Sequence, residues 1–553
     1  MPPYTSVFSL THHQLKRTCK QCNHRKVRCN GDIPCDNCQR LGFTCSLSNT
    51  TENTNKPRRL RNSSACSECR AQKVRCSNTR PQCTNCARRG WPCSYPRPVR
   101  SKHDQSDSNT QIKESDDVKT VKKFFHHLYP VPSFSFLHPP STIAKCHDGT
   151  LDESLLLAIQ AIVTLRLGQE DKDESTAQIS KAEDIIWQRL ESPSVSRLQA
   201  LLLVIIHRVE TGGFQRAFML AGLASRAASA MRLNYEKTDL TPVAAEVRRR
   251  TIWCFKLIES YFSIGLSEFE LCPFETIYLQ PPSHETSFVP PDAGDIDKEC
   301  GTLAISVRLA SLRRDIMKLT RELAVCDRPF VEISKVIRSL EQELWELHRQ
   351  MPYNNIYTTL DIITKEPWLS RHVMMMTSWH QCFCDLYRLL LPGCPEAPPR
   401  IVLDTIDADH RQQAGSICQE HAMSIIQLLC DINQRCTVPY FLEFDTAICA
   451  YHATRLMIFL SSQSRHPTFT ASRVEQCLEA IKRFFRPSSL IKPILDDMQQ
   501  LIDGLSTTPE VAILSQEPRD PPISSPAKVR QRLAIHSLLR QAEFSDDETT
   551  SPV

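Results

Sequence analysis

Twelve of the 25 cysteines in this chain of 553 residues lie between Cys19 and Cys93, and they repeat one pattern twice. A two-residue gap between cysteines allows two thiolates to bind one zinc ion from a single turn, and tetrahedral zinc takes four such ligands. Binding energy at such a site is folding energy, so metal would hold this part of the chain together. The first unit contains Cys19, Cys22, Cys29, Cys35, Cys38 and Cys45, and the second contains Cys66, Cys69, Cys76, Cys83, Cys86 and Cys93.

Six cysteines per unit do not divide into sets of four. They serve two zinc ions if two thiolates bridge both metals, since six sulfurs then supply eight coordination positions. A competing interpretation uses only the two Cys-x2-Cys pairs as a four-cysteine ribbon, which leaves Cys29 and Cys45 unused. Cys76 and Cys93 recur at the same offsets in the second unit, which favours the six-cysteine cluster. We therefore predict four zinc ions per chain.

The charge of the chain is divided between a basic head and an acidic remainder. Residues 1–102 contain 20 Lys or Arg against 4 Asp or Glu, whereas the remainder contains 47 against 58. The head thus carries +16, and about +12 remains after two clusters of two Zn²⁺ and six thiolates are counted. A head with this excess of positive charge is typical of a nucleic-acid-binding module.

No apolar stretch approaches the roughly 20 residues that a membrane-spanning helix needs. The best candidate, residues 155–167, is short and contains Gln160 and Arg166. The N-terminus also lacks the basic and apolar segments of a secretory signal. We expect an intracellular, reducing compartment and no membrane association, with the 13 cysteines beyond the head serving as small buried hydrophobes.

Helical periodicity dominates the region from about 119 to 510. Apolar residues recur at i, i+3, i+4 and i+7 from Leu198 to Ile205 and again from Cys254 to Tyr261. Further apolar helical runs lie near 303–323, 331–347, 368–391, 417–432 and 447–460, and no run alternates as strands do. Only 14 residues are glycine, which also favours helices. The chain lacks the nucleophile-elbow, zinc-protease and phosphate-loop motifs, so we expect no enzyme.

These observations predict a fold of two small zinc clusters followed by an all-α regulatory domain, with disordered linkers and a disordered C-terminal tail. The tail carries a helical segment with Leu533, Ile535, Leu538 and Leu539 on one face, followed by Phe544 among acidic residues. Such acidic, hydrophobic segments are found in activation regions, and an inert disordered end is the alternative. The expected parts are an arm over 1–18, the first cluster over 19–45, a basic linker over 46–65, the second cluster over 66–93, a linker over 94–118, the helical body over 119–510 and the tail over 511–553.

The chain resembles the fungal binuclear zinc cluster transcription factors. Both cysteine units match the family pattern, with Pro34 and Pro81 in their central loops. The body resembles the family's middle homology region, with Glu where the family usually has Asp at residue 259. The matching segments are Phe124–Pro130, Phe136–Pro139, Gly222–Ala228, Glu246–Arg250 with Trp253 and Glu259, and Leu279–Pro282.

This resemblance implies roles for individual residues. The first and fourth cysteines of each unit bridge the two metals, as Cys19 with Cys35 and Cys66 with Cys83. A lysine four residues beyond the second cysteine reads guanines of a CGG-like triplet in the major groove, which corresponds to Lys26 and Lys73 here. The neighbouring arginines contact phosphates, namely Arg25, Arg28, Arg70 and Arg75.

The resemblance further implies a nuclear activator of RNA polymerase II genes, such as those of a metabolic or secondary-metabolite gene cluster. Its partners would be double-stranded DNA, coactivators or the transcription machinery, and a second copy in a homodimer. However, the stretch after Cys93 has no sustained heptads, so the second cluster is expected to replace the partner copy. The rival hypothesis is a zinc-stabilised protein-interaction scaffold that does not read DNA.

Overall fold

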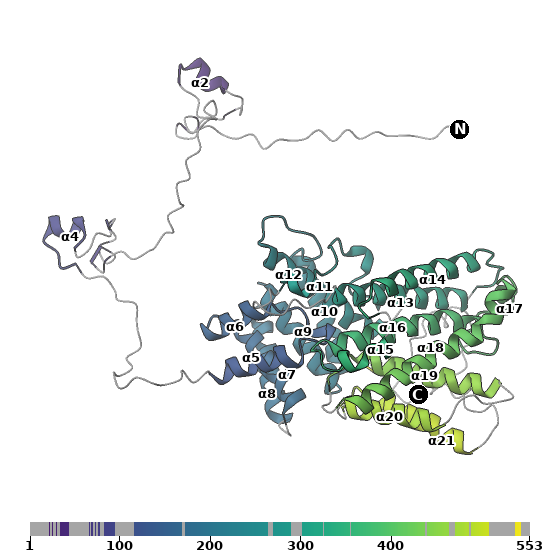
Figure 1. The fold of residues 1–553 in the computed structure, drawn as a ribbon. Helices are drawn as coiled ribbons and strands as arrows, with labels where there is room; N and C mark the ends of the chain where they lie inside the picture. The colour runs from purple at the N-terminus through teal and green to yellow at the C-terminus, as the bar shows by residue number, and fades with distance from the viewer. Residues whose placement is uncertain are drawn as a thin grey trace, which may run out of the picture. The chain divides into compact units, whose positions relative to one another are not determined.

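The chain forms two compact units, Met1–Thr110 and Gln111–Val553 (Figure 1). We refer to them as the head and the body. The computed structural model describes residues 22, 25, 29, 34–43, 66, 68, 69, 72, 74, 76, 77, 82–93, 115–168, 172–263, 269–288, 301–324, 326–353, 356–436, 440–463, 471–485, 488–507 and 537–542.

The body is built from helices, as the periodicity predicted. Within its described residues, the extended structure is limited to one isolated bridge between Tyr235 and Tyr278. Its first helices are α5 (Asp116–His127), η1 (Pro132–Phe134), α6 (Pro139–His147), α7 (Glu153–Leu167), α8 (Lys172–Gln188), α9 (Val195–Glu210), α10 (Phe214–Ala230), α11 (Pro242–Ser263), η3 (Phe274–Thr276) and α12 (Glu285–Phe288). They are followed by α13 (Thr302–Ala324), α14 (Ile333–Gln350), α15 (Ile356–Ile363), α16 (Leu369–Tyr387), η4 (Arg388–Leu390), α17 (Arg400–Leu403), α18 (Ala408–Arg435), α19 (Phe444–Gln463), α20 (Ala471–Phe484), α21 (Lys492–Thr507) and α23 (Leu538–Gln541).

The first helix of the body starts three residues before the expected boundary at 119. Ser115 is the N-cap of α5, and its hydroxyl accepts a hydrogen bond from the Val118 N–H at 3.4 Å. Asp116 and Asp117 occupy the first turn, where negative charge complements the helix dipole. Local capping chemistry therefore sets this boundary, and the apolar pattern that begins later does not.

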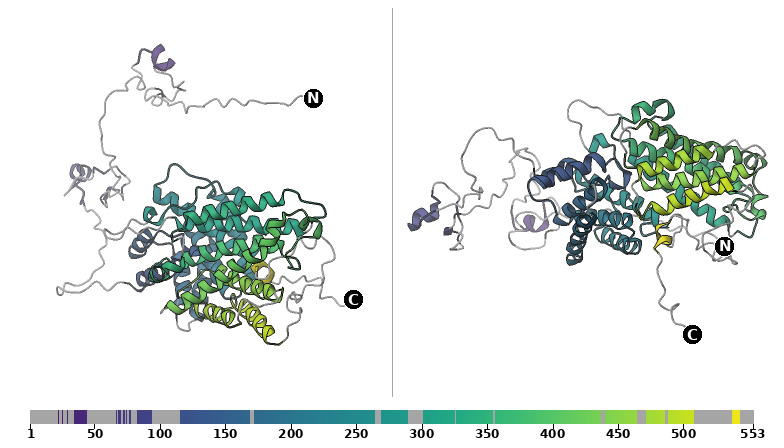
Figure 2. Two further views of the ribbon diagram at one scale, coloured as in Figure 1. Left: turned by 45° about the vertical axis from the view of Figure 1, so that its right-hand side comes forward. Right: turned by 90° about the horizontal axis from the view of Figure 1, so that it is seen from below.

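Helix α16 lies at the centre of the C-terminal half of the body. All of its residues from 369 to 387 are buried, and it packs against α13, α14, α18 and α19. Helices α5 to α10 gather at the other end of the body, as Figures 1 and 2 show. Helix α11 contacts both α9 and α13, so it links the two halves.

A buried ion network ties distant segments of the body together. The Glu285 carboxylate accepts hydrogen bonds from Arg250 at 2.5 Å, Arg371 at 2.7 Å and the Tyr129 hydroxyl at 3.0 Å. Both arginine side chains are fully buried, and that of Glu285 is 8% exposed. This network joins α16 to two of the segments that carry the family resemblance, Phe124–Pro130 and Glu246–Arg250, and to the chain just after a third, Leu279–Pro282.

The remaining charges of the Glu246–Arg250 segment are also paired. Arg249 bonds Glu236 at 2.6 Å, and the Arg248 guanidinium donates to the carbonyls of Met231 and Arg232. These contacts agree with a salt-bridged helix face rather than a phosphate site. Glu259, which stands where the family usually has Asp, accepts bonds from the Lys256 ammonium and the Leu271 N–H, both at 2.8 Å.

Part of the expected C-terminal tail packs against the body. Of residues 511–553, the structure describes 537–542, and there the chain forms the short helix α23 against α10 and α11. Leu538 is 1% exposed, and the buried Ser537 hydroxyl bonds the Phe262 carbonyl. Leu533, Ile535 and Phe544 lie outside the described residues.

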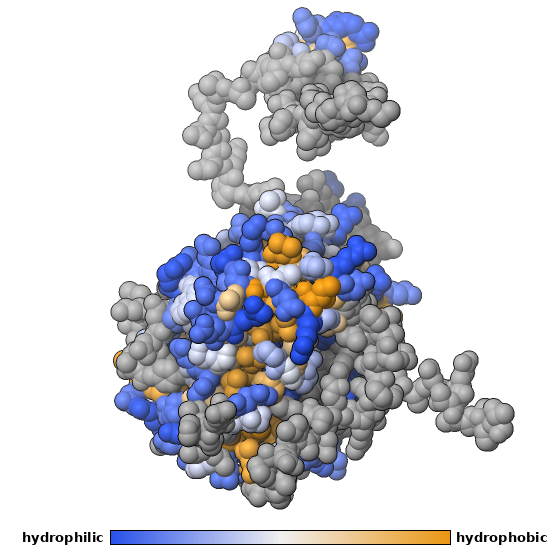
Figure 3. Space-filling view, turned by 90° about the vertical axis from the view of Figure 1, so that its right-hand side faces the viewer, coloured by the Kyte–Doolittle hydropathy of each residue, from blue (hydrophilic) through white to orange (hydrophobic). Residues whose placement is uncertain are grey.

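The body cysteines and surface complete this description. Nine of the cysteines described beyond the head are buried thiols, as expected for small hydrophobes. Figure 3 shows one face of the body, on which apolar side chains gather among predominantly polar ones. No helix in the part of the chain that the structure describes has the length and apolar character to cross a bilayer.

Candidate metal centres

A short helix positions the cysteines in the second half of the second unit. Cys83 is the N-cap of α4 (Thr84–Arg89), and its sulfur accepts a hydrogen bond from the Cys86 N–H at 3.4 Å. Gly90 ends the helix with φ of 64°, a left-handed conformation that glycine adopts without steric cost. The chain then reverses, and the Cys83 N–H donates to the Cys93 sulfur at 3.3 Å.

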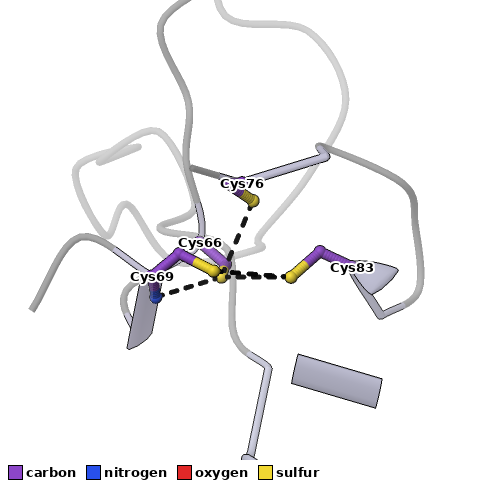
Figure 4. A group of neighbouring side chains, drawn as sticks. All are labelled: Cys66, Cys69, Cys76 and Cys83. Atoms are coloured by element: carbon purple, nitrogen blue, oxygen red, sulfur yellow. Dashed lines mark hydrogen bonds between the residues drawn. The ribbon is translucent and has the colours of Figure 1, made fainter. Parts of the chain in front are cut away.

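Six sulfurs of the second unit form two overlapping sets. Cys66, Cys69, Cys76 and Cys83 lie within 4.8 Å of one another, as do Cys66, Cys83, Cys86 and Cys93. Figure 4 shows the first set, with the Cys76 and Cys83 sulfurs each 3.8 Å from the Cys66 sulfur. Cys66 and Cys83 belong to both sets, and each of the other four cysteines of the unit belongs to one.

These distances fit zinc. A Zn–S bond of about 2.3 Å in a tetrahedral site separates ligand sulfurs by roughly 3.8 Å. The Cys69 and Cys83 sulfurs lie 3.6 Å apart, and those of Cys66 and Cys86 lie 3.7 Å apart. The donor set is therefore of the right kind, number and size for two ions that share two ligands.

Backbone hydrogen bonds distinguish the two shared sulfurs from some of their neighbours. The Cys86 N–H stabilises the Cys83 thiolate and lowers the pKa of that thiol to about 6. The Cys69 N–H lowers the pKa of Cys66 in the same way. Burial instead raises the pKa of Cys69, to about 12. The sulfurs most readily ionised are thus those common to both sets.

The described part of the first unit has the same construction. Cys35 precedes α2 (Asp36–Arg40), the helix ends before Gly42 at φ of 65°, and the sulfurs of Cys22 and Cys35 lie 3.6 Å apart. Cys22, Cys29 and Cys35 form one set within 4.8 Å, with Cys38 buried beside them. Cys19 and Cys45 lie outside the described residues.

Only one of the predicted DNA-contacting residues falls in the described part of the head. Arg25 is exposed, and its guanidinium carbon lies 5.2 Å from the centre of the Phe43 ring. The other five, Lys26, Arg28, Arg70, Lys73 and Arg75, lie outside the described residues. Arg88 and Arg89 are also exposed in the last turn of α4, and the Arg88 guanidinium bonds Asn85 at 3.4 Å. The sequence analysis did not single out Arg89, and its position after the second Cys-x2-Cys pair was the available signal.

Comparisons with known proteins agree with this geometry. A family model described as the fungal Zn(2)-Cys(6) binuclear cluster domain matches residues 17–54 and again 64–102. A model described as the fungal specific transcription factor domain matches residues 121–381. The two descriptions together account for more than half of the chain.

Two relatives illustrate the extent of the similarity. The chain is similar to a Zn(2)-C6 fungal-type transcription factor, FTF1c, of Fusarium oxysporum f. sp. lycopersici, with 26% identity over 50% of this chain and 37% of that protein. It is also similar to the ergochrome gene cluster transcriptional regulator of Claviceps purpurea, with 44% identity over 59 residues, which are 11% of this chain and 12% of that protein. The chain therefore spans well under half the length of these relatives.

Proposed function

Because the chain belongs to the fungal Zn(2)-Cys(6) binuclear cluster family of transcription factors, we propose that it reads CGG-like DNA triplets and controls RNA polymerase II genes from the nucleus. The observation that carries this proposal is the pair of overlapping sulfur sets around Cys66 and Cys83, repeated in part around Cys22 and Cys35. Such clusters fix short basic segments that are too small to fold alone. DNA recognition then depends on the side chains that follow each Cys-x2-Cys pair.

The proposed zinc ligands are the twelve head cysteines, six per cluster. Two ions per cluster would supply structural cross-links and no redox or hydrolytic chemistry. Bridging is assigned to Cys19 with Cys35 and to Cys66 with Cys83. The sharing of Cys66 and Cys83 between the two sulfur sets supports the second assignment.

Base reading is assigned to Lys26 in the first cluster and Lys73 in the second. A lysine ammonium donates to G O6 and N7 in the major groove. Phosphate contacts would fix the register without carrying sequence information. They are assigned to Arg25, Arg28, Arg70 and Arg75.

One chain carries two clusters, so a single copy is proposed to read two triplets. The linker of 20 residues between Cys45 and Cys66 spans roughly 25 Å as a flexible coil, which matches about seven base pairs. Its basic residues Lys56, Arg58, Arg59 and Arg61 would follow the intervening phosphates or serve in nuclear import.

We further propose activation of a biosynthetic or catabolic gene cluster. The similarity to a regulator of the ergochrome gene cluster supports the choice of target, and the acidic residues after Ala542 support activation. Leu538 packs against the body, so this apolar residue is not exposed to a coactivator in this arrangement.

The test is a binding titration of the full chain on duplexes with two triplets, one triplet or a scrambled sequence, at several salt concentrations. We expect the two-triplet duplex to bind most tightly at every salt concentration. Lys26→Ala and Lys73→Ala should each relax preference at one triplet by about 1–3 kcal/mol. Lys16→Ala, a lysine of the N-terminal arm, is the matched control and should leave base preference unchanged.

Two other outcomes would decide against the proposal. Equal binding to the triplet and scrambled duplexes at all salt concentrations would favour the protein-interaction scaffold. Equal affinity for one and two triplets would instead favour a single-cluster reader that dimerises, and two copies per duplex would confirm that alternative.

A further inference from the structure

The two clusters hold an aromatic residue at the same place. Phe43 and Trp91 each lie two residues before the last cysteine of their unit. The Phe43 N–H donates to the Cys38 carbonyl and the Trp91 N–H to the Cys86 carbonyl, both at 2.9 Å. A glycine in the left-handed conformation precedes each aromatic residue, so the chain turns in the same way before each ring.

Each aromatic ring lies against an arginine, but the two arginines come from different halves of the cluster. In the first unit Arg25 lies over Phe43, with its guanidinium carbon 5.2 Å from the ring centre. In the second unit Arg89 lies over Trp91 at 5.0 Å. Arg25 follows the first Cys-x2-Cys pair, whereas Arg89 belongs to α4 and follows the second pair.

The sequence explains this exchange. Arg25 and Gln72 are equivalent, since each lies three residues after the second cysteine of its unit. Leu41 and Arg89 are equivalent, since each lies three residues after the fifth cysteine. Each cluster therefore has one arginine at these two positions, and the second cluster carries it in the opposite half.

Stacking suits an arginine that must bind a phosphate. A guanidinium that contacts a ring with its face keeps the N–H groups in its plane available to bond two oxygens. Both guanidiniums belong to exposed residues. The Trp91 backbone is itself fixed, since the Gln82 amide donates to the Trp91 carbonyl at 3.1 Å. Contact with the ring already restricts the Arg89 side chain, so Arg89 loses less conformational entropy when it binds a phosphate.

We propose that Phe43 and Trp91 are positioning residues that hold one phosphate-binding arginine per cluster, Arg25 in the first and Arg89 in the second. Arg89 is then a DNA contact additional to the basic segment after the first cysteine pair. The second cluster would then contact the DNA backbone through α4 as well as through Arg70 and Arg75, whereas the first does so through Arg25 and Arg28. This inference rests on the proposed function, because it presupposes that both clusters bind DNA.

The experiment measures the affinity of the full chain for a two-triplet duplex by fluorescence anisotropy between 50 and 200 mM salt. Each phosphate contact contributes about 0.9 to the slope of log affinity against log salt. Arg89→Ala should lower the slope by about one contact, so its disadvantage should shrink about threefold across this range. Arg88→Ala is the matched control. Arg88 is the adjacent arginine of α4, but its guanidinium bonds Asn85 at 3.4 Å, whereas the Trp91 ring contacts Arg89.

The aromatic residues are tested by their dependence on the arginines. Trp91→Leu should lower the slope in the same direction as Arg89→Ala, and Trp91→Phe should restore it, because phenylalanine keeps a ring face. Adding Trp91→Leu to Arg89→Ala should cause no further loss. The corresponding first-cluster variants are Phe43→Leu and Arg25→Ala, with Leu41→Ala, an exposed apolar residue, as the control.

Zinc content, measured on each variant, must remain four per chain for the comparison. An unchanged salt slope in Arg89→Ala would overturn the proposal, as would equal effects of Arg88→Ala and Arg89→Ala. Additive losses in the double variant would show that Trp91 acts on the fold and not through Arg89. Failure of the wild-type chain to prefer triplets would instead refute the proposed function, so the two failures are distinguishable.

Discussion

Replacing Glu285 by a side chain of the same size should strongly destabilise the body. Its carboxylate is the shared partner of Arg250 and Arg371, both fully buried, and it also accepts the Tyr129 hydroxyl. Glu285→Gln keeps the size of the side chain but removes the charge. It also turns an N–H₂ group toward donors that need an acceptor.

The magnitude follows from what remains. Breaking a buried pair by removing one partner costs about 3–5 kcal/mol, because a charge is left without compensation. Arg250 keeps Glu246 at 2.8 Å and the Ser283 carbonyl at 2.9 Å, and Arg371 keeps the Pro130 carbonyl and Ser135. These remaining acceptors place the expected loss of unfolding free energy near the lower end, at about 3 kcal/mol.

Urea unfolding of the full chain, followed by circular dichroism at 222 nm and pH 7, measures this loss. The pH matters because the pKa of Glu285 is lowered. Burial alone would raise this pKa, but the charges of Arg371 and Arg250 lower it by more. A lowered folded-state pKa means that the stabilisation is present above the unfolded pKa and is lost as the pH falls through the folded value. The variant and the wild type should therefore converge in strong acid.

Glu343→Gln is the matched control. Glu343 also pairs with an arginine, Arg308, but the two side chains are 42% and 55% exposed. Exposed pairs contribute about 0–1 kcal/mol, so this variant should unfold close to the wild type. Equal losses in the two variants, or a loss below about 1 kcal/mol for Glu285→Gln, would refute the idea that the buried network stabilises the body.

Three further predictions concern pH, metal and the C-terminal segment. Burial lowers the pKa of His207 to about 4, so the unfolded state binds more protons than the folded state between about pH 6.5 and 4. The free energy of unfolding therefore decreases as the pH is lowered through this range. His207→Gln should reduce the stability difference between pH 7 and pH 5 by about 2 kcal/mol in urea unfolding, and an unchanged difference would contradict it. Cys83→Ala should lower bound zinc from four to two per chain and Cys76→Ala to three, by metal analysis, and equal losses would argue against sharing of Cys83. Leu538→Ala should cost at least about 2 kcal/mol in urea unfolding, because Leu538 is buried, and no loss would mean that α23 does not dock in solution.

The helices of the body were predictable because their signals are local. Apolar residues at helical spacing from Leu198 to Ile205 identify α9, and those from Cys254 to Tyr261 identify α11. The central position of α16 was not predictable in this way. Its sequence contains Arg371, His372 and Asp385, which a local reading assigns to a solvated face, yet all are buried. Their burial depends on partners elsewhere in the chain.

Those partners are too distant in sequence for any local pattern to reveal. Tyr129 and Glu285 are 156 positions apart, and Glu285 and Arg371 are 86 positions apart. The resemblance singled out the segments that contain or adjoin Tyr129, Arg250 and Glu285, but not the reason for them. Only the folded body shows that one carboxylate joins them.

In the head, spacing predicted which cysteines gather, since a fixed number of residues separates ligands that must meet at one ion. It did not predict the stacked arginines. Arg89 lies outside the basic segment that the resemblance identifies, and only comparison of the two units reveals its equivalence to Leu41. In the second unit, Arg89 takes the place of the arginine that Gln72 replaces in the other half. A motif that considers one position at a time does not reveal such a relation between two positions.

The difference between head and body has a physical origin. Helices α2 and α4 have 5 and 6 residues, too short to be stable alone, and each unit has too few residues to bury an apolar core. The buried cysteines described in the head gather in sets that fit a metal ion, whereas most cysteines described in the body are buried singly among long helices. Freed from building a core, the non-cysteine positions of each cluster can change without loss of the fold. The arginine that contacts the ring can thus lie at the position of Arg25 in one cluster and at that of Arg89 in the other, on one repeated scaffold.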